Sequence, residues 1–495
     1  MLRIDWVSDV PPANSGQLLV VAFTKDDIDV ISGRFGEDVR AALTRAGVTG
    51  KAWESFRFTS LEGGFHHVEL IAVAELGSAE NLRKLAFEAG RSARSLGANE
   101  LVLDMRDALQ LEGEDASTAA RLVAEGLELS GYRYDRYRAK DEEPSAKASF
   151  EGVSVVAPGK PGAGIERGRI VAAAISRARD LGNGPAELVT PTFLAETASE
   201  LAAELRGAGH DVSCEVFDLE ECERRSMGLY LAVARGSDEP PKFIHLTYKP
   251  KGESKGRICL VGKGVTFDSG GYSLKPTDGM LAMKLDMGGA AAVIGAMEGI
   301  ARLELPYEVH VISAAAENMV SGRAYRLGDV FRASNGKTVE INNTDAEGRL
   351  TLADALHFAV GLEPDLIVDF ATLTGACIVA LGPHIAGVMT RDDELASSWQ
   401  AAGGRAGEDH WRLPLPKPLM SMLDSKIADM RNTGERAGGS LTAGLFLEQF
   451  VGDKRWMHVD IAGPAIVSKP FGVNVEGSSG FPVATILEFL ASEPV

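Results

Sequence analysis

Short apolar runs alternate with amphipathic segments along the first third of the chain. The apolar runs are typical of strands, whereas the amphipathic segments repeat their apolar positions with the helical period. We expect strands at Gln17–Phe23, His67–Ala74 and Glu100–Leu103, and helices at Glu80–Leu96 and Ser117–Glu128. This alternation predicts an α/β fold.

The same alternation resumes after a charged stretch punctuated by Pro and Gly, from about Ala139 to Gly168. We expect a domain junction there, between an N-terminal domain of residues 1–165 and a C-terminal domain of residues 166–495. The second domain has predicted helices at Arg169–Asp180, Phe193–Ala208, Ala290–Ile300 and Leu352–Val360, and predicted strands at Lys242–Tyr248, Arg257–Val261, Glu308–Ala314 and Leu366–Phe370. Each domain should be a sheet flanked by helices, with ligands at the carboxyl ends of the strands.

Composition narrows the functional classes. The 495 residues carry a net charge of -19, which opposes non-specific binding to nucleic acid. The 4 cysteines are scattered without a CxxC pair, so we expect a reducing compartment and neither a zinc ribbon nor a disulfide framework. The start lacks a basic, then apolar, leader, and no window approaches the roughly 18 apolar residues of a membrane span. These features favour a soluble cytoplasmic protein.

The segment Asn343-Thr-Asp-Ala-Glu-Gly-Arg-Leu350 carries two carboxylates directly before a helical pattern. Residues i and i+2 point to nearly opposite faces of a helix, whereas in extended chain they share a side. We therefore expect Asp345 and Glu347 in the loop before the helix, where both could grip one ion. The alternative for this segment alone is an ordinary acidic first turn with Asp345 as N-cap.

Two upstream segments add further candidate ligands. One follows the strand expected to end at Val261 and sets Lys263, Asp268 and Lys275 among glycines, which let backbone approach a bound ion. The other opens an Ala-rich helix and places Asp286 at its expected N-cap. Taken alone Asp286 is a structural cap, and only the other carboxylates make it a candidate ligand.

The candidate residues of the three segments are four carboxylates, two lysines and one arginine, and no segment contains a histidine. Converging carboxylates repel one another, so divalent cations are their natural compensation, and two dications would neutralise four carboxylates. A paired-metal site creates hydroxide at neutral pH and clamps the attacked group from both sides. This is hydrolase chemistry, and it leaves a two-metal phosphoesterase as an alternative, although such sites generally add histidines.

The segment Asn343–Leu350 resembles the signature of the leucine aminopeptidase family, and the other two segments are similar to its remaining metal-site motifs in order and spacing. The resemblance covers the catalytic half of the chain and includes Asn318–Asp329, Ala371–Ala376 and His458–Gly463. Over the first third it is architectural only. It implies a metal-dependent aminopeptidase that releases leucine and other mostly apolar residues from the free amino ends of peptides.

The resemblance also implies roles for individual residues. The tighter metal site corresponds to Lys263, Asp268, Asp286 and Glu347, and the exchangeable site to Asp268, Asp345 and Glu347. Lys275 resembles the residue that polarises the scissile carbonyl, and Arg349 the one that holds a bicarbonate acting as general base. The backbone of Thr372 and Leu373 would line the substrate cleft, and Met283, Gly375 and Ala462 would border the pocket for the first side chain.

Some residues have a plainer interpretation. Read alone, Met283 and Ala462 belong to the core, and only the resemblance places them at a pocket. His357 and His458 sit in apolar patterns, so we interpret both as core histidines without a catalytic role.

The resemblance further implies a hexamer of two stacked trimers, with the N-terminal domain in an oligomeric or regulatory role. The ligand set suits Zn, Mn or Co. Because some bacterial members of the family bind DNA as regulators, a DNA-binding role is a second alternative, which the net charge of -19 disfavours. No membrane partner is expected.

Overall fold

The computed structural model describes residues 2–14, 16–59, 65, 67–73, 78–106, 108–109, 115–138 and 150–492. The chain forms two compact units. Unit 1 comprises Met1–Ala172 and Phe471–Val473, and unit 2 comprises Ala173–Pro470 and Asn474–Val495. The stretch that the sequence marks as a junction contains strand β6 (Gly152–Val156) and the start of helix α5 (Gly164–Asn183), while residues 139–149 lie outside the described part.

Unit 1 is built on a six-stranded sheet within its described residues, in the order β1-β6-β5-β2-β4-β3. All neighbours pair in parallel except the edge pair β3 and β4, which is antiparallel. Besides β6, the strands are β1 (Arg3–Val7), β2 (Gln17–Phe23), β3 (Ser55–Thr59), β4 (His67–Ala72) and β5 (Glu100–Asp104). The helices are α1 (Ile28–Phe35), α2 (Glu37–Ala46), α3 (Ala79–Leu96) and α4 (Asp115–Leu129), followed by α5.

Unit 2 is built on a mixed sheet ordered β16-β15-β18-β14-β9-β11-β8-β7, with β10 paired to β11. Its strands are β7 (Asp211–Phe217), β8 (Lys242–Lys249), β9 (Arg257–Gly262), β10 (Gly264–Asp268), β11 (Glu308–Asn318), β14 (Leu366–Ala371), β15 (Ile385–Met389), β16 (Asp409–Arg412) and β18 (Trp456–Asp460). The central strands β18, β14, β9 and β11 run parallel. The small strands are β12 (Val330–Arg332), β13 (Thr338–Glu340), β17 (Met430–Arg431), β19 (Ile466–Val467) and β20 (Gly477–Ser478).

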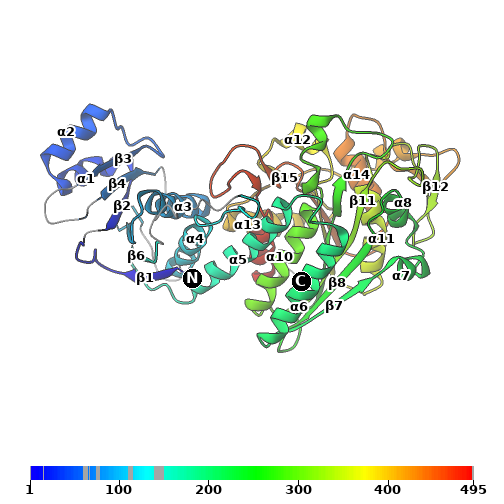
Figure 1. The fold of residues 1–495 in the computed structure, drawn as a ribbon, viewed down its shortest axis with the longest axis horizontal. Helices are drawn as coiled ribbons and strands as arrows, with labels where there is room; N and C mark the ends of the chain where they lie inside the picture. Colours follow the sequence, from blue (N-terminus) through cyan, green and yellow to red (C-terminus); the bar gives the residue numbers. More distant parts are fainter. Residues whose placement is uncertain are drawn as a thin grey trace. The chain divides into compact units, whose positions relative to one another are not determined.

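Helices cover this sheet (Figure 1). They are α6 (Pro191–Gly207), α7 (Leu219–Arg224), α8 (Gly228–Ala234), α9 (Thr277–Met280), α10 (Gly288–Arg302), α11 (Gly348–Val360), α12 (Gly375–Leu381), α13 (Asp393–Ala406), α14 (Gly439–Glu448) and α15 (Val483–Ala491). The chain crosses from β9 through α10 to β11, and then returns through α11 past β9 to β14. Because parallel crossovers are right-handed, this reversal of direction places α10 and α11 on opposite faces of the sheet. Ligand sites in such sheets lie at the carboxyl ends of the strands beside the reversal.

The sequence predictions for the regular elements agree with these bounds to within a few residues, with one exception in the Gly-rich segment. Residues expected to form a loop after β9 continue as β10, which pairs in parallel with β11. The reason is that Val265 and Phe267 can extend and pair despite the flanking glycines.

Among the described residues, one stretch is long and apolar enough to cross a membrane by composition, contrary to the sequence expectation. It is Thr277–Arg302, and 72% of its most apolar window is buried inside the protein. Most of it is α10, whose residues from Gly288 to Ala301 are all buried. The stretch is therefore the core helix of unit 2, apolar on all sides because it packs between the sheet and other helices.

Candidate metal centre

The carboxyl ends of the central strands bring the candidate residues of unit 2 together. Lys263 directly follows β9, and Asp268 is the last residue of β10. Asp286 follows the short 3-10 turn η2 (Met283–Leu285), and Glu347 is the N-cap residue of α11. Segments 84 residues apart in the chain thus meet at one edge of the sheet.

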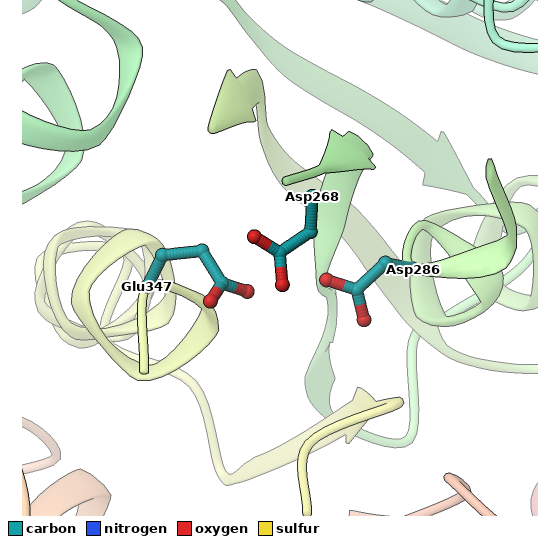
Figure 2. A group of neighbouring side chains, drawn as sticks. All are labelled: Asp268, Asp286 and Glu347. Carbon is teal, nitrogen blue, oxygen red and sulfur yellow. The ribbon is translucent and has the colours of Figure 1, made fainter. Parts of the chain in front are cut away.

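Three carboxylates form the centre of the site. Asp268, Asp286 and Glu347 each offer an oxygen, and these oxygens all lie within 4.8 Å of one another. Figure 2 shows the three side chains pointing toward one another from a strand end, a turn and a helix start. Their residues are only 1%, 4% and 1% exposed. Buried carboxylates at this spacing need a positive partner, and carboxylate oxygens are suitable ligands for divalent metals.

Asp286 differs from its expected role as a helix cap. The N-cap of α10 is Met287, and Asp286 ends the preceding turn. Its carboxylate accepts hydrogen bonds from the Lys263 ammonium at 2.8 Å and from the Thr372 hydroxyl at 2.9 Å. A charged partner inside the site therefore holds this carboxylate away from the helix end.

Lys263 lies among the carboxylates, and its side chain is 4% exposed. Its Nζ is 2.7 Å from Asp286 Oδ2 and 2.9 Å from Glu347 Oε1, and it donates to the carbonyl of Thr372 at 3.0 Å. Gly348 leaves the room for this arrangement, because a Cβ there would lie 2.3 Å from Lys263 Cε. The glycine of the signature segment is thus a packing requirement of the lysine.

Lys275 connects Asp345 to the three central carboxylates. Its Nζ lies 2.9 Å from Asp268 Oδ2 and 2.5 Å from Asp345 Oδ1. Asp345 lies outside the three-carboxylate group itself. Asp345 and Glu347 do precede α11 together, as the spacing predicts, but Asp345 bonds to Lys275 whereas Glu347 contacts Lys263.

The electrostatics of the site leave negative charge in excess. Burial raises the pKa of Asp268 to about 6 and raises that of Asp286 well above its usual range, with Glu347 adding to both. Burial would also raise the pKa of Glu347, but the Lys263 and Lys275 ammonium groups together outweigh it and lower that pKa. Burial would lower the pKa of Lys263, but Asp286 and Glu347 outweigh it and raise that pKa. Four carboxylates facing two ammonium groups are a set of donors that divalent ions fit.

Buried oxygens point to the same conclusion. Asp286 Oδ2, Asp345 Oδ1 and Glu347 Oε1 are buried and contact only the ammonium of Lys263 or Lys275. Glu347 Oε2 is buried with neither a hydrogen-bond nor an ion-pair partner among the described residues. Such atoms are rare in folded proteins and usually mark an ion, a water or a catalytic role. A metal would therefore fit Glu347 Oε2 as its missing partner.

Arg349 lies beside this group in the first turn of α11 and is 7% exposed. Burial lowers the pKa of its guanidinium to about 10. Its Nη1 donates to the carbonyl of Asn432 at 2.8 Å, while its Nε is buried without a hydrogen-bond partner among the described residues. A buried cation with a free donor suits a small anion.

Two residues that the sequence analysis did not single out support the site. Asn318 ends β11 and donates from Nδ2 to Asp268 Oδ1 at 2.7 Å and to the carbonyl of Thr344 at 2.9 Å. Asp460 ends β18 and accepts hydrogen bonds from Leu373 N and from the Thr374 hydroxyl. Both residues lie at the ends of strands, within segments that carry the family resemblance. That position is the sequence signal by which they could have been identified.

The expected substrate residues lie around the same strand ends. Thr372 and Leu373 follow β14, and Gly375 begins α12 in an exposed position. Ala462, 9% exposed, donates its N–H to Asp460 Oδ1. Met283 is half-buried in η2, so it is not the core residue that its apolar character alone suggests.

The two histidines differ in burial. His458 is completely buried, and its Nδ1 lies 2.6 Å from Asp369 Oδ1. Its Nε2 has no hydrogen-bond partner among the described residues. His357 is only half-buried, near the end of α11. Neither belongs to the metal-binding group of the described chain.

An α/β sheet with a buried carboxylate and lysine cluster at its strand ends defines a metallohydrolase. Residues 176–487 match the catalytic domain of the cytosol aminopeptidase family, and residues 21–141 match its N-terminal domain. The chain therefore belongs to the cytosol aminopeptidase family, and it is a metal-dependent leucyl aminopeptidase. This assignment favours peptide bonds over phosphate esters as the substrate.

Curated relatives match along most of their length. A probable cytosol aminopeptidase of Rippkaea orientalis is 43% identical over 468 residues, which is 94% of this chain and 94% of the relative. One from Synechococcus elongatus is 45% identical over 435 residues, which is 88% of this chain and 87% of the relative.

Solved structures show the same fold. A mutant of tomato leucine aminopeptidase has a TM-score of 0.89 at 34% identity, covering 99% of this chain and 97% of that chain. The bottromycin maturation enzyme BotP in complex with Mn has a TM-score of 0.84 at 36% identity, covering 97% of this chain and 99% of that chain. A relative with the same fold thus binds manganese.

Proposed function

We propose that this aminopeptidase holds two divalent ions in the carboxylate and lysine cluster. Lys263, Asp268, Asp286 and Glu347 bind the tighter ion, while Asp268, Asp345 and Glu347 bind the exchangeable one. The observation that carries this assignment is the buried group of Asp268, Asp286 and Glu347, whose oxygens lie within 4.8 Å of one another and include Glu347 Oε2 without a partner among the described residues. Asp268 and Glu347 would be shared by both ions, and both belong to the group of neighbouring carboxylates.

The two ions supply a water-derived nucleophile at neutral pH and a double clamp on the attacked carbonyl. The chain's own cations complete the chemistry. Lys275, whose side chain is 16% exposed, donates its ammonium to the oxyanion that develops on the scissile carbonyl. Arg349 holds bicarbonate, the general base, through its buried guanidinium. Its Nε without a partner among the described residues supports this role.

The substrate cleft runs along the segment that follows β14. The backbone of Thr372 and Leu373 aligns the peptide, and Met283, Gly375 and Ala462 border the pocket for the first side chain. The half-buried thioether of Met283 and the small size of Gly375 and Ala462 support a preference for leucine and other apolar side chains. The peptide must carry a free amino terminus, because its neutral amine would lie beside Asp286 and would supply a ligand to a bound metal.

The native metal is Zn or Mn. Carboxylate oxygens with one lysine amine suit either ion, and the Mn complex of BotP, a relative 36% identical to this chain, supports Mn.

The active assembly is a homohexamer in the cytoplasm, in which residues 1–165 serve oligomerisation or regulation and residues 166–495 carry catalysis. Large apolar side chains are exposed on unit 2, including Leu274 at 62%, Leu281 at 82% and Val379 at 89%. Such exposure supports burial in an assembly. The relatives' name, cytosol aminopeptidase, supports the location. The net charge of -19 supports peptides rather than nucleic acid as partners, and no membrane is involved.

The requirement for a free amino terminus provides the test of function. The protein should hydrolyse leucine amide and leave acetyl-leucine amide intact, because acetylation removes the basic lone pair of the amine. Release of ammonia from both substrates at matched concentration measures the difference. Similar rates on the two substrates would refute the proposed requirement for a free amino terminus, and with it the aminopeptidase site.

The two lysines should respond differently to substitution. Lys263→Ala removes a metal ligand, so metal affinity should fall and excess Mn or Zn should restore part of the activity. Lys275→Ala removes a charge that acts mainly in the transition state, so turnover should fall roughly a hundredfold or more with metals retained.

Metal titration of both variants, with bound ions counted by elemental analysis, measures this difference. Rescue of Lys275→Ala by metal would reverse the two roles. Equal loss of metal from both variants would remove the distinction altogether.

A further inference from the structure

Asn432 is a completely buried amide that comes from a distant part of the chain. It directly follows β17, 85 residues beyond Glu347 in the sequence, and its exposure is 0%. A buried amide is costly unless its donors and acceptor are bonded. The hydrogen-bond partners of the Asn432 side chain therefore indicate its role.

Within the described part of the chain, the side chain of Asn432 bonds only to the backbone of the loop before α11. Its Oδ1 accepts hydrogen bonds from Asn342 N at 3.0 Å and Asn343 N at 3.4 Å. Its Nδ2 donates to the carbonyls of Asn343 at 2.7 Å and Ala346 at 3.3 Å. These four bonds bracket Asp345, which lies between Asn343 and Ala346, and Ala346 directly precedes Glu347.

The backbone of Asn432 holds two more groups. Its N–H donates to the carbonyl of Glu340 in β13 at 3.0 Å, and its carbonyl accepts from Arg349 Nη1 at 2.8 Å. One residue is thus joined to the strand before the loop, to the loop itself and to the arginine after it. These hydrogen bonds supply partners to loop backbone groups that belong to no helix or strand.

A second pair of bonds flanks this contact. Asn342 Nδ2 donates to the carbonyl of Thr433 at 3.1 Å, and Thr433 N donates to Asn342 Oδ1 at 3.0 Å. The two hydrogen bonds between Asn342 and Thr433 extend the parallel pairing of β13 with β17 by one further contact. The loop that carries Asp345 is therefore fastened to a separate segment rather than to the metal-binding strands alone.

We propose that Asn432 is a positioning residue that sets the affinity of the exchangeable metal position and the orientation of Arg349. The inference rests on the proposed function, in which Asp345 binds the exchangeable ion. Asp345 reaches the site from a loop, whereas Asp268 ends a strand and Glu347 begins a helix. Loss of the amide therefore displaces Asp345 more than the other ligands. Groups that orient a metal ligand typically contribute 10–100-fold to metal affinity.

The test compares Asn432→Asp and Asn432→Ala with a control, Asn335→Ala. Asn432→Asp keeps the shape and the acceptor but loses both donors, so it separates the hydrogen bonds from the volume. Asn335 forms a similar amide contact at the turn between β12 and β13, accepting from Lys337 N at 3.0 Å and donating to the Gln449 carbonyl at 3.2 Å. It belongs to the same small sheet but contacts no residue of the metal loop in the described contacts. The control therefore reports on stability alone.

The full-length variants are dialysed against graded Mn2+ and their bound Mn is counted by elemental analysis. Wild type and Asn335→Ala should show two binding steps at the same concentrations. Both Asn432 variants should keep the tighter step and shift the weaker one to roughly 10–100-fold higher Mn2+. Their response to bicarbonate should fall as well, because Arg349 loses its fixed acceptor.

Asn342→Ala, which removes the flanking pair of bonds, covers the case in which Asn432→Ala does not fold. It should shift the weaker step in the same direction. Wild-type Mn2+ binding in Asn432→Asp and Asn342→Ala, with only a lower Tm, would overturn the proposal and leave a structural role. A wild type with a single binding step would instead refute the two-metal function itself.

Discussion

Gly348 should not tolerate alanine, a change that usually stabilises a helix. Glycine inside a helix costs about 0.5–1 kcal/mol relative to alanine, so Gly348→Ala in the first turn of α11 would ordinarily be neutral or favourable. Here the added Cβ would lie 2.3 Å from Lys263 Cε and 2.5 Å from its Nζ. Carbon atoms pack at about 3.5–4.0 Å, so the end of Lys263 must move by more than about 1 Å.

That displacement breaks the contacts of a buried charge. Lys263 Nζ is 2.7 Å from Asp286 and 2.9 Å from Glu347, and no water-exposed position is nearby because its side chain is 4% exposed. Breaking one partner of a buried ion pair costs about 3–5 kcal/mol. The helix gain offsets at most about 1 kcal/mol, so the free energy of unfolding should fall by about 2–4 kcal/mol. Metal affinity should fall with it, because Lys263 is a proposed ligand.

Gly404→Ala is the matched control. Gly404 lies inside α13, has open space around an added Cβ, and should gain stability as an ordinary helical glycine does. Thermal unfolding and Mn content are measured for both variants under the same conditions. Gly348→Ala should lower Tm by roughly 5 °C while Gly404→Ala holds or raises it. A Gly348→Ala protein with wild-type Tm and Mn content would show that the start of α11 does not confine Lys263.

Two further changes test the charges behind the metal centre. Arg349→Ala should fold and keep both ions but lose most of the rate stimulation by added bicarbonate, and an unchanged response would remove Arg349 from the mechanism. Burial would lower the pKa of His458, but Asp369, with a smaller contribution from Asp460, outweighs it and raises that pKa. The pair therefore stabilises the fold fully below the unfolded pKa of about 6.5, and less as pH rises through the folded value. Asp369→Asn should therefore lower Tm more at pH 6 than at pH 9. An equal decrease in Tm at both pH values would contradict a charged His458.

Local features of the chain account for most of the regular elements. Strand β2 and helix α3 fall almost where the apolar patterns predict them, because their side chains pack on one face or one core. Strand β7 was not predicted from its pattern. It is an edge strand with mostly partly or fully exposed residues, so its sequence carries little apolar signal.

At the candidate site, too, the sequence predicts some features and misses others. The sequence by itself determined which residues are candidate metal ligands. They are a lysine and an aspartate among glycines, and Asp345 and Glu347 just before a helix. It misplaced Asp286 as a helix cap, because cap propensity is local while the attraction of the Lys263 ammonium is not.

Only the tertiary structure decided which of these groups meet. The strand order β14-β9-β11 brings three segments to one edge, so that oxygens of Asp268, Asp286 and Glu347 lie within 4.8 Å of one another. It also delivers Asn432 to the loop of Asp345 from 87 residues away. Short-range patterns cannot encode such contacts, because they depend on which strands pair and on where distant loops are packed.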